Sequence, residues 1–175
     1  MEEGLKAEES LKIKESPKMQ EGPKKDGKEC LAGQILSCFQ DVVPDKEKKP
    51  EQFSPLVLAF IGDAVYSLII RTLVVERGNM QVNKMHRAVS QLVKAQAQQE
   101  LYHAIEGLLT EEEQAVFKRG RNAKSHTSAK NASITEYRNA TGMEALVGYL
   151  YLSGNMDRIL YLMSEGLKKE TDKNG

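Results

Sequence analysis

Apolar residues recur along this chain with the spacing of α-helices rather than the alternation of β-strands. The clearest signal begins at Ser54-Pro55, where a residue that caps helix N-termini precedes a proline suited to the first helical position. The apolar positions continue to Val75, and Gly78 stands where helices commonly end. The pattern therefore predicts one long, strongly hydrophobic helix in this segment.

The same reasoning predicts four more helices further along the chain. One begins near Asn83 and closes at Gly107, and its apolar positions recur at helical steps: Met85, Val89, Leu92, Val93, Leu101 and Ile105. Two begin at capping boxes, in which a Ser or Thr precedes a Glu by three residues. These boxes span Thr110–Glu113 and Ser133–Glu136, and their helices end near Gly120 and at about Ser153-Gly154.

Asn155 caps the last predicted helix, whose apolar stripe consists of Ile159, Leu160, Met163 and Leu167. With a possible helix from Cys30 to Val43, the chain has five or six helices and no convincing strand. We therefore predict an all-α fold. The helical signal and the apolar residues together indicate a folded domain over 54–170.

The N-terminal part has a different composition. Fifteen of residues 1–29 are Lys, Asp or Glu and none is aromatic, which is too little apolar surface to offset the entropy of ordering. Residues 44–52 read as a linker between two prolines. We expect residues 1–53 to be a charged, largely disordered extension with a possible short helix at 30–43.

Composition excludes several classes of protein. The 175 residues are 40% hydrophobic, enough for a core, and two cysteines eight residues apart form neither a disulfide framework nor a usual zinc pair. No secretory signal is visible at the start, so a reducing cytoplasm is the expected compartment. The long apolar run contains Asp63 near its centre, which a membrane span would have to bury. We expect no membrane partner.

Two acids stand out because each lies in one of the two most hydrophobic helices. Asp63 is preceded by Gly62 and Ala59, and Glu144 has Ala140, Ala145 and Gly148 around it. Small residues on facing helices allow close backbone approach, which would place the two carboxylates near one another. Like charges at short range need a bridging cation or a proton, and Mg²⁺ suits one or two carboxylates. The alternative is that Arg71 pairs with Asp63 and Arg138 with Glu144.

The charged residues are also unevenly distributed. The formal net charge is zero, yet residues 1–51 hold ten Lys against twelve acids, while residues 52–175 hold fifteen basic residues against thirteen acidic ones. No acid occurs between Gln114 and Thr135, and five cations lie within the segment 118–130: Lys118, Arg119, Arg121, Lys124 and Lys130. We interpret this segment as a polar loop that binds phosphate groups, although a solvated loop is the alternative.

These features combine into one hypothesis, in which the cations hold a polyanion and the carboxylates hold a metal ion for phosphodiester hydrolysis. No glycine-rich phosphate loop, G-x-S-x-G or His-Glu-x-x-His motif competes with it. The basic segment contains no aromatic residue, which disfavours stacking on single-stranded bases and favours a duplex recognised by its shape.

Three segments resemble a known family. FIGDAVY at Phe60–Tyr66 resembles the acidic signature of the ribonuclease III catalytic domain, and MEALVGYLYL at Met143–Leu152 resembles that family's second acidic helix. KRGRNAKS at Lys118–Ser125, with Tyr137-Arg138 and TGMEALVGYLYL, is similar to Mini-III, the small branch without a double-stranded-RNA-binding domain. The resemblance covers about 54–167.

The resemblance implies an all-α, cytoplasmic, homodimeric endoribonuclease that hydrolyses double-stranded RNA with Mg²⁺ and leaves 5′-phosphate and 3′-hydroxyl ends. For Mini-III it further implies maturation of the ends of the 23S ribosomal RNA precursor. Asp63 matches the essential catalytic acid and metal ligand, and Glu144 matches the metal-binding glutamate. We expect the RNA backbone to contact Lys118, Arg119, Arg121, Asn122, Lys124 and Lys130.

The chain departs from larger ribonucleases III at two acidic positions. Ala59 stands where they usually have Glu, and Thr141 stands where they usually have Asp. Each protomer therefore has two candidate metal-binding carboxylates, Asp63 and Glu144. Whether one or two metal ions take part in hydrolysis stays open at this point. Two other functions remain as alternatives: a non-catalytic helical RNA-binding protein, and a helical module whose apolar faces bind a protein.

Overall fold

The computed structural model describes residues 30–39, 42, 48–124 and 133–173. These residues form helices and contain no strand, so the all-α prediction is confirmed. The α-helices are α1 (Leu31–Cys38), α2 (Pro55–Glu76), α3 (Val82–Val93), α4 (Ala95–Ile105), α5 (Glu111–Arg121), α6 (Ile134–Leu152) and α7 (Met156–Lys173). Two short 3₁₀ helices, η1 (Pro50–Gln52) and η2 (Glu106–Leu108), precede α2 and α5.

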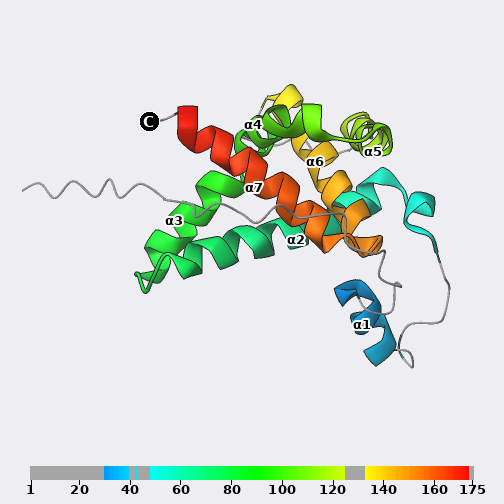
Figure 1. Ribbon diagram of the computed structural model, residues 1–175, viewed down its shortest axis with the longest axis horizontal. Helices are drawn as coiled ribbons and strands as arrows, with labels where there is room; N and C mark the ends of the chain where they lie inside the picture. Colours follow the sequence, from blue (N-terminus) through cyan, green and yellow to red (C-terminus); the bar gives the residue numbers. More distant parts are fainter. Residues whose placement is uncertain (1–29, 40–41, 43–47, 125–132, 174–175) are drawn as a thin grey trace, which may run out of the picture.

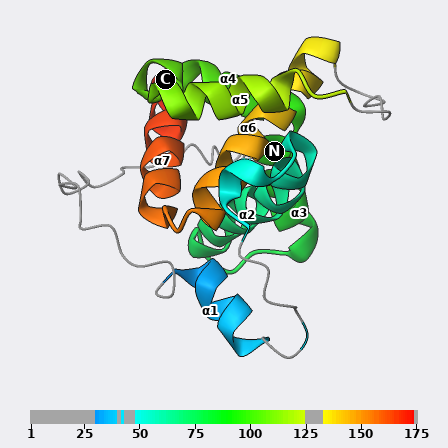
Figure 2. The ribbon, with the colours of Figure 1, turned by 90° about the vertical axis from the view of Figure 1, so that its right-hand side faces the viewer.

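Helix α6 is the centre of the molecule. Figures 1 and 2 show it enclosed between α2 on one side and α4 and α5 on the other. From Asn139 to Tyr151 every residue of α6 except Glu144 is buried. A helix that is apolar on all sides has to be surrounded by other elements, and α6 satisfies this requirement. Its exception, Glu144, therefore lies in a largely apolar setting.

The predicted helix ends are confirmed where side chains fix them. Ser54 Oγ accepts a hydrogen bond from the Val57 amide at 3.3 Å and so caps α2. Both capping boxes are present, at the starts of α5 and α6. Gly78 follows α2 with φ +116°, a backbone conformation that favours glycine.

The helix predicted from Asn83 to Gly107 is wrong as a single element. The structure breaks it at Lys94, whose backbone is extended with ψ 154°, into α3 and α4. Two side-chain hydrogen bonds satisfy carbonyl groups at the end of α3: Tyr66 Oη donates to Leu92 O, and Gln98 Nε2 donates to Val93 O. With this break and the short α1, the described residues contain seven α-helices rather than five or six.

The predicted stripe of α7 also needs one correction. Leu160 is 45% exposed, whereas Leu162 is buried, as are Ile159 and Met163. The buried residues of α7 lie three and four positions after Ile159, as the helical period requires. On the same face of α7, Gly166 packs against the side chain of Leu101 on α4. Leu160 lies one residue away from that stripe and faces outward.

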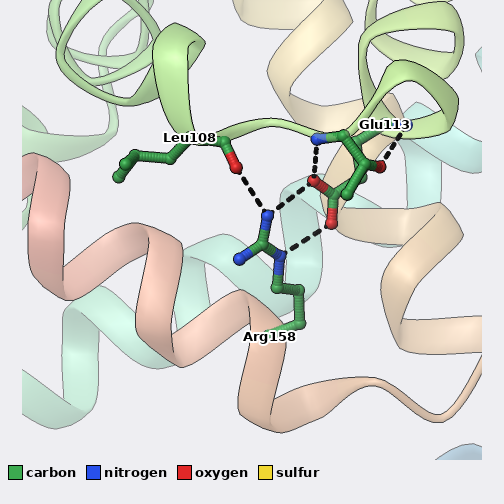
Figure 3. A network of polar contacts seen from close by, with 4 residues as sticks. Leu108, Glu113 and Arg158 are labelled. Atoms are coloured by element: carbon green, nitrogen blue, oxygen red, sulfur yellow. Dashed lines mark hydrogen bonds and ion pairs between the residues drawn. The ribbon is translucent and has the colours of Figure 1, made fainter. Parts of the chain in front are cut away.

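An ion pair joins α7 to the start of α5. Arg158 Nε and Nη2 each donate at 2.8 Å to the Glu113 carboxylate, and Nη2 also donates at 2.7 Å to the carbonyl of Leu108 (Figure 3). The Glu113 side chain is only 7% exposed. A buried carboxylate held by a bidentate guanidinium fixes the relative position of these two helices.

Helix α1 stands beside the bundle in both overall views (Figures 1 and 2). It covers 31–38, which is shorter than the 30–43 allowed by the sequence, and the position of a Cβ at Gly154 would lie 3.1 Å from the Cys30 side chain. Neither Cys30 nor Cys38 forms a disulfide among the described residues. The expected disorder of residues 1–29 lies outside the described residues.

Helix α2 buries one face and exposes the other. Leu58, Val65, Tyr66, Ile70 and Val74 belong to the core. The opposite face exposes other large apolar side chains, above all Phe60 at 82%. By length and composition alone α2 could cross a membrane, a test that the core helix of a folded domain also meets. Here its inner face packs on α6.

Candidate active site

Two glycines let α2 and α6 approach closely at the candidate site. A Cβ added at Gly62 would overlap the carbonyl oxygen of Glu144, and one added at Gly148 would overlap the carbonyl oxygen of Leu58. The two backbones are therefore in direct contact. The sequence prediction that small residues around Asp63 and Glu144 face one another is confirmed, with Gly62 and Gly148 at the contact itself.

This close crossing brings the two acids to one hollow. Asp63 and Glu144 both line an open cavity of about 380 Å³ between the first half of α2 and the first half of α6. Asp63 is exposed and Glu144 is half-buried. The other lining residues are Leu56, Ala59, Phe60, Ile61, Ala64, Tyr137 and Thr141. The hollow is thus largely apolar, with two carboxylates in it.

The electrostatics of the hollow favour a positively charged ligand. Burial raises the pKa of the Glu144 carboxyl to about 7, a hydrogen bond from Gln98 opposes the rise, and the nearby charge of Asp63 adds to it. A cation between the two carboxylates would reverse this unfavourable balance by stabilising both ionised forms. The raised pKa is therefore a sign of an acid that lacks a positive partner.

The alternative, in which each acid pairs with an arginine, finds no support among the described residues. Their salt bridges are His103–Glu106, Arg158–Glu113 and Lys168–Glu165. Arg71 donates its Nε to Ser67 at 3.2 Å instead. Asp63 and Glu144 therefore face the hollow without an ion-pair partner in the described part of the chain.

The two positions at which larger ribonucleases III usually have an acid, and this chain does not, line the same hollow. Ala59 and Thr141 both line it, and the Thr141 hydroxyl donates to the carbonyl of Tyr137 at 3.0 Å. No group of three or more His, Cys, Asp or Glu that could hold a metal occurs in the described residues. The protein therefore offers two carboxylates here.

The donor set fits a hard divalent cation. Mg²⁺ is commonly bound by one or two carboxylates and keeps several waters, so a two-carboxylate hollow open to solvent suits it. Asp63 and Glu144 are the residues that would hold it. Among the described residues that line the hollow, none offers the thiolate or imidazole ligands that zinc prefers.

The predicted RNA-binding segment is partly helix rather than loop. Lys118, Arg119 and Arg121 lie in the last turn of α5, because the helix continues to Arg121. Cations in a last helical turn are favoured by the negative end of the helix dipole, which explains why the acid-free stretch begins inside the helix. Asn122 and Lys124 follow the helix and are exposed, and Lys130 lies outside the described residues.

The cationic end of α5 is anchored to both helices that carry the acids. Gly120 packs against Gly142 and Ala145 of α6, on the two sides of Glu144 in sequence. Arg119 Nη2 donates at 3.1 Å to the carbonyl of Phe53, just before α2. The end of α5 is consequently packed on α6 and joined to the segment just before α2.

One polar layer around the site was not predicted from the sequence. Gln98 on α4 is 2% exposed and donates its amide to Glu144 Oε1 at 3.1 Å. Its neighbour Gln99 accepts a 3.0 Å hydrogen bond from Asn139 of α6. A signal was available, because Gln98 stands on the stripe with Leu101 and Ile105, where an apolar residue is expected.

Comparison with known proteins shows to which protein family the fold and the two-carboxylate hollow belong. Residues 56–155 match the Ribonuclease III domain, and the chain belongs to this family of endoribonucleases. Within the family it belongs with the Mini-ribonuclease 3 proteins. It is 53% identical over 114 residues to the Mini-ribonuclease 3 of Clostridium tetani, covering 65% of this chain and 76% of that protein. It is 45% identical over 126 residues to the one from Enterococcus faecalis, covering 71% and 96%.

A solved structure supports the fold. The crystal structure of a protein from Fusobacterium nucleatum superposes with a TM-score of 0.63 at 31% sequence identity, covering 71% of this chain and 99% of that one. The family resemblance predicted from three segments is therefore confirmed. Enzymes of the ribonuclease III family act on double-stranded RNA and generally use a divalent metal ion.

Proposed function

We propose that this protein is a Mg²⁺-dependent endoribonuclease that cleaves double-stranded RNA, with Asp63 and Glu144 as its catalytic and metal-binding residues. The observation that carries this proposal is the shared hollow, which collects two carboxylates without an ion-pair partner among the described residues. The catalytic unit that we propose spans residues 54–170, and residues 1–53 form an extension to it.

The two acids have different roles in this proposal. Asp63 is exposed and can reach a phosphate of a bound duplex together with the water that attacks it. Glu144 is half-buried and held by Gln98, so it forms the fixed side of the site. A bound Mg²⁺ would activate the water and neutralise charge on the phosphate. Water adds to phosphorus and the 3′ oxygen leaves, which gives 5′-phosphate and 3′-hydroxyl ends.

The RNA backbone, in this proposal, lies along the exposed end of α5. The guanidinium groups of Arg119 and Arg121 and the ammonium groups of Lys118 and Lys124 supply phosphate contacts, and Asn122 adds an amide. Lys130 belongs to the same predicted set. Contacts of this kind position a duplex without reading its sequence, so recognition rests on A-form shape.

We further propose that the enzyme is a homodimer formed through the outer face of α2. Phe60, Ala64 and Leu68 follow one another at steps of four on this exposed stripe, and Phe60 and Leu68 are 82% and 57% exposed. Exposed apolar stripes of this size are typical of protein interfaces. A second copy bound there would cover Phe60 at the edge of each hollow.

The natural substrate that we propose is the precursor of 23S ribosomal RNA, cleaved at duplexes near its ends in the cytoplasm. The support is the family resemblance together with the site, which recognises duplex shape rather than base sequence. Mapping the 5′ ends of 23S RNA in cells that lack this enzyme tests the assignment, because unprocessed ends should accumulate.

A cleavage assay on a long RNA duplex tests the proposed function. The protein should cut with Mg²⁺ and stop when EDTA removes the metal. Asp63→Asn should lose cleavage by several orders of magnitude while keeping its fold and its affinity for duplex RNA. Asp157→Asn, a matched change of an exposed Asp on α7 away from the hollow, should cleave like the parent. Normal cleavage by Asp63→Asn would contradict the proposal.

A further inference from the structure

Gln98 is a buried amide whose Nε2 donates both to an acid of the candidate site and to a carbonyl at the end of α3. The residue is 2% exposed. Its Nε2 donates to Glu144 Oε1 at 3.1 Å and to Val93 O at 3.2 Å. Both partners are acceptor oxygens. If the amide were turned over, the Oε1 of Gln98, which is itself an acceptor, would face them, so the donor Nε2 is the atom that lies against both.

These bonds connect three helices to one acid. Val93 is the last residue of α3, Gln98 belongs to α4, and Glu144 belongs to α6. With Oε1 of Glu144 occupied by Gln98, its second oxygen remains for the hollow that it shares with Asp63. The side chain of Glu144 is therefore held by a group that does not itself line the hollow.

The energetics indicate that Gln98 is present for its N–H groups. Its Oε1 is buried and has no hydrogen-bond partner among the described residues, which is an unfavourable state for a polar atom. A hydrocarbon side chain at this position of the α4 stripe would avoid that cost. Filling the corner between α3 and α4 consequently does not explain a glutamine, whereas donation to Val93 O at the end of α3 and to Glu144 at the hollow does.

We propose that Gln98 is a positioning residue of this enzyme, which orients the Glu144 carboxylate for binding a divalent cation opposite Asp63. The inference rests on the proposed function and extends it to a residue outside the hollow. Residues that orient metal ligands in this way typically change metal affinity about 10- to 100-fold when removed.

The test compares two neighbouring glutamines. Gln98→Met keeps the length of the side chain and removes the donor to Glu144. Gln99→Met is the matched control, because it removes the other amide contact between α4 and α6, to Asn139, without touching Glu144. Binding of Mn²⁺ and Mg²⁺ to the RNA-free proteins is measured by calorimetry, together with metal-free binding of duplex RNA and thermal unfolding.

Gln98→Met should bind the metal about tenfold more weakly and need a correspondingly higher Mg²⁺ concentration for half-maximal cleavage. Its metal-free affinity for RNA should remain within about twofold of the parent value, since the cations of α5 are unchanged. Gln99→Met should bind metal like the parent even if its unfolding temperature falls. Metal binding by Gln98→Met equal to that of Gln99→Met would overturn the proposal.

Gln98→Asn covers the case in which the methionine variant does not fold, since it keeps an amide that is one methylene shorter. Parental metal affinity in that folded variant would also overturn the proposal. Failure of the proposed function looks different. In that case the parent itself binds no divalent ion and cuts no duplex, whereas failure of this inference alone leaves a parent that does both.

Discussion

At Gly62 a single hydrogen atom decides how close the two acid-bearing helices come. The position of its missing Cβ is already occupied by the carbonyl oxygen of Glu144. No rotamer change can relieve an overlap with backbone, so the helices themselves would have to separate. Separation would also move Glu144 away from Asp63. Stability and the geometry of the site therefore depend on the same contact.

Gly62→Ala should consequently lower the free energy of unfolding by about 1–3 kcal/mol, the usual cost of overpacking a core. It should also reduce Mg²⁺-dependent cleavage. Gly107→Ala is the control, because a Cβ there meets no atom within 4 Å. Urea denaturation of both variants checks the prediction, and equal stabilities for the two would contradict the close crossing.

Single residues also show which parts of the candidate site can be predicted from the sequence. The acids and their small neighbours were identifiable because a charge in an apolar helix needs a partner and because glycine allows close approach. Gln98 was missed because a neutral amide carries no charge signal and its partner is 46 residues away. Its position on the apolar stripe of α4 was the only local sign.

At the scale of elements, local signals predicted helix starts better than helix interiors. Ser54, Thr110 and Ser133 act through bonds to their own helices, so their caps are readable from the sequence. The break at Lys94 has no proline or glycine to mark it. It is stabilised by the nearby Gln98 and by Tyr66, which lies 26 residues before Leu92, and the contact with Tyr66 could not be predicted from the local sequence.

The ion pair between α5 and α7 should make stability depend on pH. Burial raises the pKa of Glu113, but hydrogen bonds from Arg158 and Thr110 outweigh it and hold the pKa below its ordinary value. The folded state therefore favours the ionised carboxylate. This stabilisation is complete above the pKa of the unfolded chain, about 4.3 for Glu, and is lost as the pH falls through the lower folded value.

Glu113→Gln should therefore be less stable than the parent by about 1–3 kcal/mol near pH 7, with the difference shrinking below about pH 4.3. Glu111→Gln is the control, since Glu111 lies in the same first turn of α5 and is exposed. Chemical denaturation across this pH range measures both. Parallel curves for the two variants would show that the pair contributes nothing specific.

The cationic end of α5 leads to a prediction about RNA affinity. Arg121→Ala removes an exposed charge, whereas Arg119→Ala would also remove the hydrogen bond to Phe53 and confuse binding with stability. Loss of one phosphate contact should weaken binding of all duplexes alike and lower the slope of log affinity against log salt by about 1. Titrations of a catalytically inactive protein at several salt concentrations measure this slope.

Lys84→Ala provides the matched control for Arg121→Ala. It removes one positive charge from the exposed surface of α3. The net charge of the two variants is therefore equal. If both lower the salt slope by the same amount, the effect reflects total charge, and the end of α5 is not the RNA contact.

At the scale of the whole molecule, the outer face of α2 is an apolar surface that the other described residues leave exposed. The same helix supplies core residues, one acid of the site and this apolar stripe. A free apolar stripe lowers solubility, and association of two copies would bury it. It would also exclude water from the edge of each hollow, which links assembly to catalysis.

Leu68→Asp should therefore convert the proposed dimer into a monomer and reduce cleavage strongly. The residue lies two turns from Phe60 on the stripe and is 57% exposed, so a charge there should not disturb the fold of one protomer. Leu73→Asp is the control: it is 42% exposed on the same helix but about 140° away around the helix axis. Sedimentation equilibrium gives the mass of each variant, and circular dichroism confirms the fold. A dimeric Leu68→Asp, or a monomeric parent, would assign this face to a different partner and leave each hollow to act alone.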